Sequence, residues 1–201
     1  GVTGVQTCAL PIYEDEKQNL YITKKSELIE IIKQVMETEY AACNLVASRS
    51  ERNYYVWTHR LLVTRFMILE GAPSMIDFGR EIFHSEVSHI NNWCKYNISD
   101  GPAFHYYSEL IVLIYQTEIT NNMNFYLGFS AHNQKPYIIS SFNDFLNLMH
   151  EGGNLCSDLL QDFPQHESIW YFLRRIVSIH LYLFQDLLQL FQENCLSESP
   201  S

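Results

Sequence analysis

The sequence is short of positive charge. Its 201 residues include 13 lysines and arginines against 23 aspartates and glutamates, so the formal net charge is −10 at pH 7. An acidic surface repels phosphate backbones and anionic lipid, so we expect neither nucleic acid nor a charged membrane as the main partner. Apolar runs are also short. The longest candidate, residues 176–191, is interrupted by polar residues and falls below the roughly 18–20 residues of a membrane span, so none is expected.

Motifs for metal binding and catalysis are missing as well. No two cysteines have CxxC spacing, no HExxH occurs, and His84 and His89 are five residues apart, so they lie on different helical faces. A glycine-rich phosphate loop and a nucleophile motif are equally absent. We therefore expect no cofactor, no metal and no catalytic residue in this chain. With no paired-cysteine pattern and no secretory signal, the thiols are expected to be reduced and the protein cytoplasmic.

The two ends of the chain carry little structural signal. Residues 1–12 contain no charge, resemble the translation of a sequencing-library adapter, and are expected to be disordered. The chain does not begin with Met, so we expect a fragment of a longer protein. Residues 13–25 are interpreted as a leader to the first helix, and residues 193–201 as a tail.

Between these ends the hydrophobic periodicity is helical almost everywhere. Ser26 opens the first helical segment, and Gly71 with Pro73 gives a clear stop after the second. The same two-helix pattern then recurs, which predicts an all-α fold of stacked helical hairpins, an α–α superhelix with no sheet. The expected helix pairs, with an insertion loop at 119–140, cover residues 26–72, 74–118 and 141–192. Each second helix begins with a cap followed by an aromatic anchor, at Trp57, Phe104 and Trp170.

The stretch Asn53–Arg60 reads NYYVWTHR and carries the most specific pattern in the chain. Asn53 is suited to cap the second helix. Trp57 lies one turn further in and is expected to be buried. Arg60 follows three residues later on nearly the same face, so its guanidinium is expected to pack on the indole while its donors reach loop carbonyls or a partner.

This pattern resembles the repeat of protein prenyltransferase α subunits, Asn-Tyr-x-x-Trp-x-His-Arg. Weaker copies at 97–106 and 162–170 resemble, more narrowly, the α-like subunits of type III protein geranylgeranyltransferase. The copies are unequal. The second has Phe104 in place of the tryptophan and Tyr107 where the arginine would lie, and the third has its arginine, Arg174, one position late.

The resemblance implies a non-catalytic α-like subunit that binds a prenyltransferase β subunit, which would carry zinc and most of the prenyl-diphosphate site. Together they would transfer a geranylgeranyl group to protein substrates with a C-terminal cysteine. Arg52 stands where some α subunits place a lysine near the diphosphate, so a contact there is expected. The residues expected to form the repeat signature and to bind the partner are Asn53, Tyr54, Trp57, His59, Arg60, Asp100, Phe104, His105, Pro164, His166, Trp170 and Arg174.

Two other interpretations stay open at this point. A TPR-like interaction scaffold without an enzyme partner would share the helix pairs, but TPR repeats lack the Asn-x-x-x-Trp-x-His-Arg pattern. A HEPN-type ribonuclease would use a short Arg-x(4–6)-His motif, which occurs here as Arg52 with His59 and as Arg175 with His180. That motif is short enough to arise by chance, and an acidic chain is a poor RNA binder.

Overall fold

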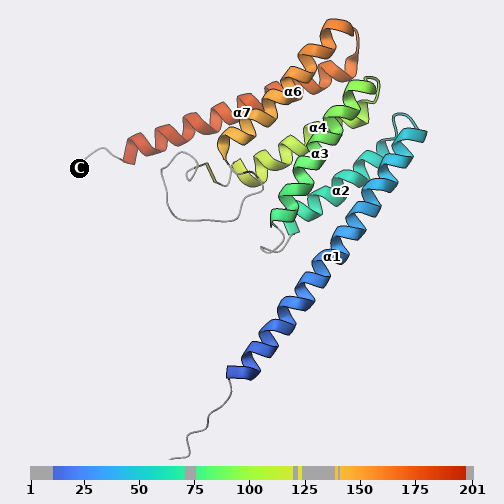
Figure 1. The fold of residues 1–201 in the computed structure, drawn as a ribbon. Coiled ribbons are helices and arrows are strands. Elements are labelled where there is room, and N and C mark those ends of the chain that lie inside the picture. The colour runs from blue at the N-terminus through green and yellow to red at the C-terminus, as the bar shows by residue number, and fades with distance from the viewer. Residues whose placement is uncertain (1–10, 71–75, 120–121, 124–138, 140, 198–201) are drawn as a thin grey trace, which may run out of the picture. The chain divides into compact units, whose positions relative to one another are not determined.

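The computed structural model describes residues 11–70, 76–119, 122–123, 139 and 141–197. The regular structure in these residues is helical and contains no strand, which confirms the all-α prediction. The elements, drawn in Figure 1, are α1 (Pro11–Arg49), α2 (Tyr54–Glu70), α3 (Ile76–Tyr96), α4 (Gly101–Ile114), the π-helical segment η2 (Tyr115–Ile119), α6 (Phe142–Asp162) and α7 (Glu167–Ser197).

The chain forms two compact units, residues 1–41 and residues 42–201. The described part of the first unit is a single helix, the larger part of α1. The sequence predicted this helix to open at Ser26, but it begins at Pro11 and takes in the segment read as a leader. The reason is that this segment contains several good helix formers, among them Glu14, Glu16, Lys17, Lys24 and Lys25, with no glycine or second proline to stop a helix, and proline suits a first helical position. Pro11 and Ile12, which were expected to be disordered, therefore form the start of α1, and the predictions for residues 1–10 lie outside the described residues.

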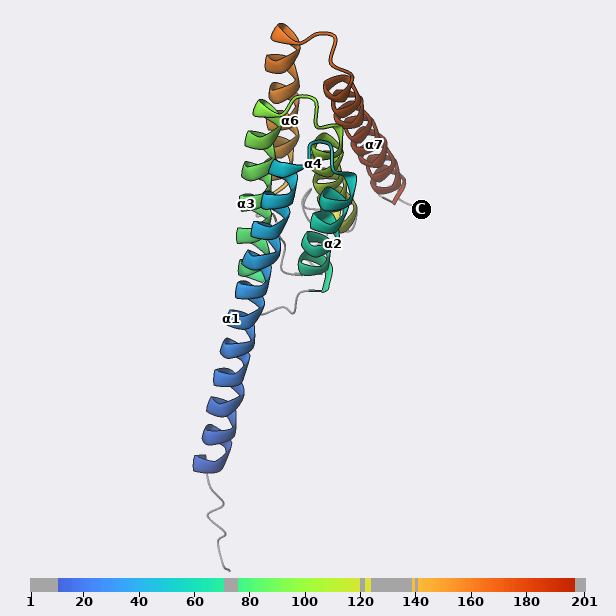
Figure 2. The same cartoon turned by 90° about the vertical axis from the view of Figure 1, so that its right-hand side faces the viewer.

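The second unit is built in two layers (Figure 2). The last turns of α1 lie with α3 and α6 in one layer, and α2, α4 and α7 form the other. Helix α4 is central, because it packs against α2, α3, α6 and α7. Its sequence, GPAFHYYSELIVLI, is apolar around most of the helix, which suits an element surrounded by neighbours. The first helices of each pair thus share one layer, and the second helices share the other.

The helix boundaries follow local signals in the sequence. The Ser141 hydroxyl accepts a hydrogen bond from the backbone N–H of Asp144 at 3.2 Å, which confirms the predicted cap of α6. Helix α6 ends at Asp162, before Pro164, as expected. Helix α7 continues to Ser197, beyond the predicted end at 192, since no glycine or proline interrupts it before Pro200. The expected start at Ser74 and most of the 119–140 insertion lie outside the described residues.

Two adjacent glycines in α6 give a test of how closely the layers approach. A Cβ added at Gly152 would lie 3.2 Å from Ile176 Cδ1 and 3.3 Å from Phe172 Cζ, whereas one at Gly153 would meet nothing within 4 Å. We expect Gly153→Ala to raise the free energy of unfolding by up to about 1 kcal/mol, the helix-propensity gain. Gly152→Ala should gain less or lose stability, because the side-chain ends of Phe172 and Ile176 must move aside in a packed interface. Urea unfolding of both variants measures this, and equal stabilisation would contradict the close approach.

Candidate functional site

Trp57 anchors the junction between the first two helix pairs. It is 3% exposed, which confirms the predicted burial, and Asn53 Oδ1 accepts from the backbone N–H of Val56 at 3.2 Å as the expected cap. The Trp57 indole N–H donates to Asp100 Oδ2 at 3.1 Å, and the Trp93 indole N–H donates to the same oxygen at 2.9 Å. Asp100 is also the N-cap of α4. One buried carboxylate therefore ties α2, α3 and α4 together.

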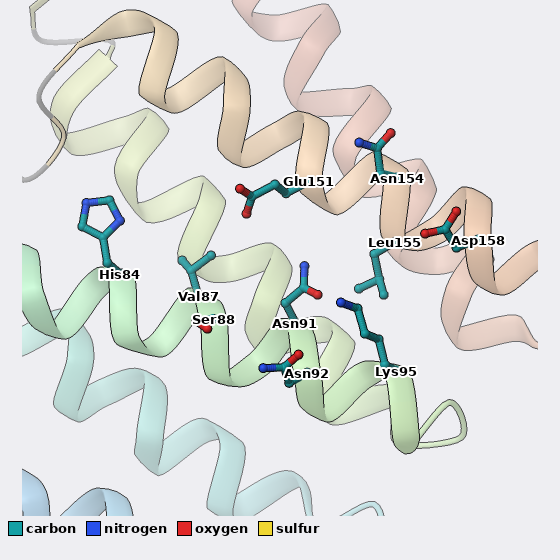
Figure 3. A pocket seen from close by; sticks show the side chains of 10 residues that line it. All are labelled: His84, Val87, Ser88, Asn91, Asn92, Lys95, Glu151, Asn154, Leu155 and Asp158. Carbon is teal, nitrogen blue, oxygen red and sulfur yellow. The ribbon is translucent and has the colours of Figure 1, made fainter.

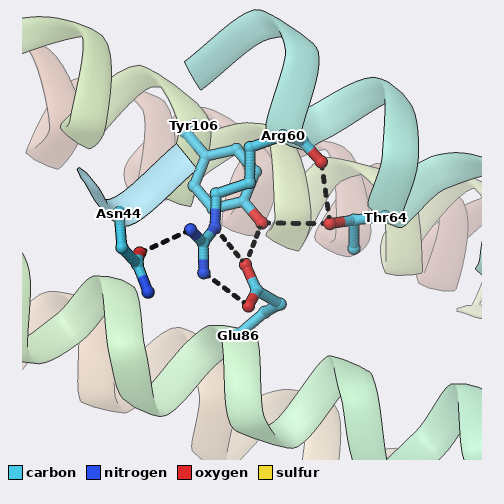
Figure 4. A network of polar contacts seen from close by, with 5 residues as sticks. All are labelled: Asn44, Arg60, Thr64, Glu86 and Tyr106. Atoms are coloured by element: carbon cyan, nitrogen blue, oxygen red, sulfur yellow. Dashed lines mark hydrogen bonds and ion pairs between the residues drawn. The ribbon is translucent and has the colours of Figure 1, made fainter. Parts of the chain in front are cut away.

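Arg60 lies inside the protein rather than at a partner surface. It is 2% exposed and forms a bidentate ion pair with Glu86, with Nε 2.5 Å from Oε2 and Nη2 2.7 Å from Oε1 (Figure 4). Its Nη1 donates to Asn44 Oδ1 at 2.7 Å, and its guanidinium carbon lies 5.9 Å from the centre of the Trp57 ring. Packing against the indole was expected, whereas these donors reach the side chains of Glu86 and Asn44 and not loop carbonyls or a partner.

Two further hydroxyls complete this network, which we call the Arg60–Glu86 network (Asn44, Arg60, Thr64, Glu86 and Tyr106). The Tyr106 hydroxyl donates to Glu86 Oε2 at 2.6 Å and lies 3.1 Å from Thr64 Oγ1. Burial, and next the charge of Glu86, raise the pKa of Tyr106 well above its usual value, so its hydroxyl stays a donor. Side chains from α1, α2, α3 and α4 thus meet at one point.

Glu86 could have been recognised in the sequence as a charge on an apolar face. It lies four residues from both Ile82 and Ile90, which are buried, so a helix must turn it toward the core. A buried carboxylate requires a partner, and Arg60 supplies it. Because both groups are almost fully shielded from solvent, the network holds helices in register and is not placed to meet a substrate.

An exposed edge lies beside this network, where α2, α4 and α7 begin. Tyr54, which is 55% exposed, stacks on His105 with ring centres 6.3 Å apart and planes 16° apart. His105 in turn lies 6.4 Å from the ring of Tyr171. We call these three residues the ring ladder. The sequence singled out Tyr54 and His105, but Tyr171 carried no motif and was missed.

Arg52 and His59 lie on the outside of the same helix pair. Both side chains are exposed. Arg52 has a φ of 56°, in the left-handed region, and lines a depression of about 270 Å³ together with Ser48, Asn97 and Ser99. The exposure of Arg52 is compatible with a ligand contact.

The third repeat places its anchor differently from the prediction. Trp170 is 46% exposed, and its indole N–H donates to the carbonyl of Pro164 at 2.8 Å, which closes the turn before α7. The buried aromatic is Phe172, which stacks on Tyr107 with centres 4.9 Å apart. Ile169 and Phe172 share the inward face of α7, and Trp170 is rotated off it. The expected anchor role passes from Trp170 to Phe172.

The remaining signature residues divide between core and surface. Phe104 is fully buried and packs 5.7 Å from Phe172. His166 lies against Phe163 at 6.0 Å between ring centres, and Pro164 and Arg174 are exposed. Of the predicted residues, only Arg60 belongs to the Arg60–Glu86 network. The others lie near the starts of α2, α4 and α7.

The arginine and histidine of the ribonuclease interpretation make other contacts. Arg175 Nη2 is 3.0 Å from Glu109 Oε1, and His180 Nδ1 is 2.9 Å from the carbonyl oxygen of Ile176. In the described part of the chain no three His, Cys, Asp or Glu side chains are grouped to hold a metal ion. No helix within the described ranges combines the length and hydropathy needed to cross a membrane.

The ion pair gives a first prediction for stability. Replacing Arg60 alone, in Arg60→Met, leaves Glu86 charged and buried, and should lower the free energy of unfolding by about 3–5 kcal/mol. The double variant Arg60→Met/Glu86→Leu removes both charges and should recover most of that loss, while Tyr106 keeps Thr64 as a neighbour. Urea unfolding of the single and double variants gives the coupling energy. Losses that simply add would show that the pair is not coupled.

His89 gives a prediction for pH dependence. Its Nε2 is buried without a hydrogen-bond partner, and burial lowers its pKa, with the charge of Arg60 lowering it further and Glu86 opposing. His89 is therefore protonated near pH 6.5 in the unfolded chain but only at lower pH in the folded protein. The contribution of His89 to the free energy of unfolding should be complete above pH 6.5 and should be lost as the pH falls below it. Thermal unfolding at pH 7.5 and 5.5 should show a smaller loss for His89→Gln than for the unaltered chain. An equal loss in both would contradict this assignment.

Comparison with known proteins fits this arrangement. No family model matches the chain. It is 24% identical over 177 residues to protein prenyltransferase alpha subunit repeat-containing protein 1 of Danio rerio, covering 86% of this chain and 39% of that protein. It is 25% identical over 182 residues to the protein of the same name in Homo sapiens, covering 85% and 43%.

The 1-B form from Xenopus laevis is 25% identical over 163 residues, covering 76% of this chain and 36% of that protein. The chain thus spans about two fifths of the length of these curated relatives. Their names agree with the resemblance that the Asn53–Arg60 pattern and the stretches at 97–106 and 162–170 indicated, so the chain is a relative of the protein prenyltransferase α-subunit repeat-containing proteins.

Proposed function

We propose that this chain acts as a non-catalytic α-like subunit, which binds a prenyltransferase β subunit and supports geranylgeranyl transfer to a cysteine of a protein substrate. The observation that carries the proposal is the Asn53–Arg60 signature. It folds as a buried junction in a chain that aligns over 76–86% of its length with proteins named for this repeat. The cytoplasm is the compartment that this role requires.

Exposed apolar faces support a subunit that is covered by other protein. On α2, Tyr55, Leu62, Phe66 and Leu69 are spaced seven, four and three residues apart, so they share one face, and each is 41–85% exposed. A similar stripe runs along α7, through Val177, Leu181, Phe184, Leu188 and Phe191. Monomeric soluble proteins rarely leave apolar patches of this extent open to water. An α layer that wraps a partner would cover them with a large interface.

The proposal divides the chemistry between the two subunits. Zinc, which activates a cysteine thiolate, and most of the diphosphate site are assigned to the β subunit. This chain would supply shape and partner contacts through the helix starts that carry the ring ladder. Arg52, which is exposed, is the proposed cation near the leaving diphosphate, where a fixed positive charge stabilises developing negative charge.

The test is co-expression of this chain with a Rab-type geranylgeranyltransferase β subunit. We expect co-elution on gel filtration, and transfer of labelled geranylgeranyl to a Cys-terminated acceptor when the longer relative is used. Leu62→Asp/Phe66→Asp should weaken the complex at least about tenfold, because it places charge in a buried interface. Leu146→Asp, on α6, is the control and should not.

Each outcome of this experiment distinguishes a function. Failure of both the chain and its longer relative to bind the β subunit would reject the subunit assignment. A complex without transfer would leave an interaction scaffold. RNA cleavage by the isolated chain, lost in His59→Ala or His180→Ala, would favour the ribonuclease interpretation instead.

A further inference from the structure

Helices α3 and α6 face each other across a groove that no part of the proposed function uses. Its main part, shown in Figure 3, has a volume of about 520 Å³. An adjoining part of about 210 Å³ shares His84, Val87 and Glu151 with it. Val87, Leu148 and Leu155 provide apolar surface along it. We refer to the two parts together as the α3–α6 groove.

The groove exists because both helices turn polar stripes toward each other. On α6 the lining residues are spaced three or four apart, so they form one continuous stripe: Asp144, Asn147, Glu151, Asn154 and Asp158. On α3 the facing stripe is His84, Ser88, Asn91 and Lys95. Each helix instead buries its apolar side against the second layer, α3 against α4 and α6 against α7. Two polar stripes held apart in this way leave room for a third chain.

The lining side chains suit a peptide backbone. Asn91, Asn92, Asn147 and Asn154 each carry both a donor and an acceptor, which is the pattern that peptide N–H and C=O groups require. The Asn91 Nδ2 donates to the Tyr107 hydroxyl at 3.3 Å, which holds that amide in place. A segment in the polyproline II conformation has no internal hydrogen bonds, so its backbone groups can pair with the lining amides whatever its side chains are.

The charges select among peptides. The groove is lined by three carboxylates, those of Asp144, Glu151 and Asp158, against the single ammonium of Lys95. The carboxylates are seven residues apart along α6, which is about 10 Å at 1.5 Å per residue. A segment in the polyproline II conformation has three residues per turn and rises about 3.1 Å per residue, so its side chains three apart share one face and lie about 9 Å apart. Lys95 lines the part of the groove that contains Asp158, so the acidic character is strongest around Asp144 and Glu151.

From this geometry we propose that the α3–α6 groove binds a segment of a partner protein in the polyproline II conformation with basic residues three apart, Lys/Arg-x-x-Lys/Arg. The two basic side chains pair with Asp144 and Glu151, and the asparagines pair with the backbone between them. The stripe from residue 144 to residue 158 is about 21 Å long, which accommodates about seven residues at about 3.1 Å each. The site lies in the first layer, so it acts independently of whether a β subunit binds.

The experiment measures the anisotropy of a labelled, end-capped peptide, Arg-Ser-Gly-Arg-Ser-Gly-Arg, added to the whole chain. We expect saturable binding, and binding at least about tenfold weaker for Asp144→Asn/Glu151→Gln, as loss of two charge contacts implies. The control pair Glu81→Gln/Asp162→Asn removes the same charge from α3 and α6 outside the groove, and should change the affinity less than about twofold. Circular dichroism checks that each variant is folded.

Two further arms separate the groove from general attraction to an acidic protein. A peptide of the same composition with its arginines adjacent should bind more weakly, because only the spaced form reaches both carboxylates. Asn154→Leu should also weaken binding without a change in charge. Absence of binding, equal affinity for the two peptides, or an equal loss in the control pair would overturn the proposal. If Asp144→Asn disturbs the start of α6, the single variant Glu151→Gln is used in its place, and it should also weaken peptide binding.

Discussion

The buried Arg60–Glu86 pair is the constraint on which the packing of the first two helix pairs depends. Taking two charges out of water costs several kcal/mol for each ion, and only good geometry and complete hydrogen bonding offset that cost. Here the guanidinium reaches both carboxylate oxygens and Asn44, and Tyr106 donates to the same carboxylate. A shift of α2 against α3 would separate the two charges, and a shift of α1 or α4 would remove a hydrogen bond from one of them. The network therefore sets the register of the junction more strongly than apolar contacts, which tolerate sliding.

The later repeats dispense with this device. Tyr107 stands where the second copy would have its arginine, and it stacks on Phe172 of the third. Aromatic stacking contributes about 1 kcal/mol beyond area burial and leaves no charge to satisfy. The fully buried ion pair between α2 and α3 thus gives way, between α4 and α7, to aromatic packing beside a partly exposed ion pair of Glu109 with Arg175. That change explains how a degenerate repeat keeps its architecture after the signature residues are lost.

The sequence was most informative where a single local rule decides the outcome. The Asn53 cap, the burial of Trp57 and the Ser141 cap each depend on residues within one helical turn, and all three are confirmed. It was less informative where contacts join distant segments. Glu86 lies 26 residues from Arg60, and no spacing rule links them. The buried anchor of the third repeat is Phe172 and not Trp170, because the rotation of α7 about its axis turns Phe172 inward. That rotation is set by neighbouring helices that the motif does not contain.

The two layers of the second unit offer two different kinds of surface. The second helices carry the ring ladder and the exposed apolar stripes of α2 and α7. Burial of such surfaces stabilises a complex in proportion to the apolar area removed from water, so a wide contact is needed. The α3–α6 groove is narrow and polar, and its gain comes from hydrogen bonds and charge pairing with one segment of a partner. Broad apolar contact suits a permanent subunit, whereas a short charged groove suits a reversible and salt-sensitive contact. Because the two surfaces belong to different layers, occupation of one leaves the other open, and a single chain could hold a subunit and capture a substrate or regulator at the same time.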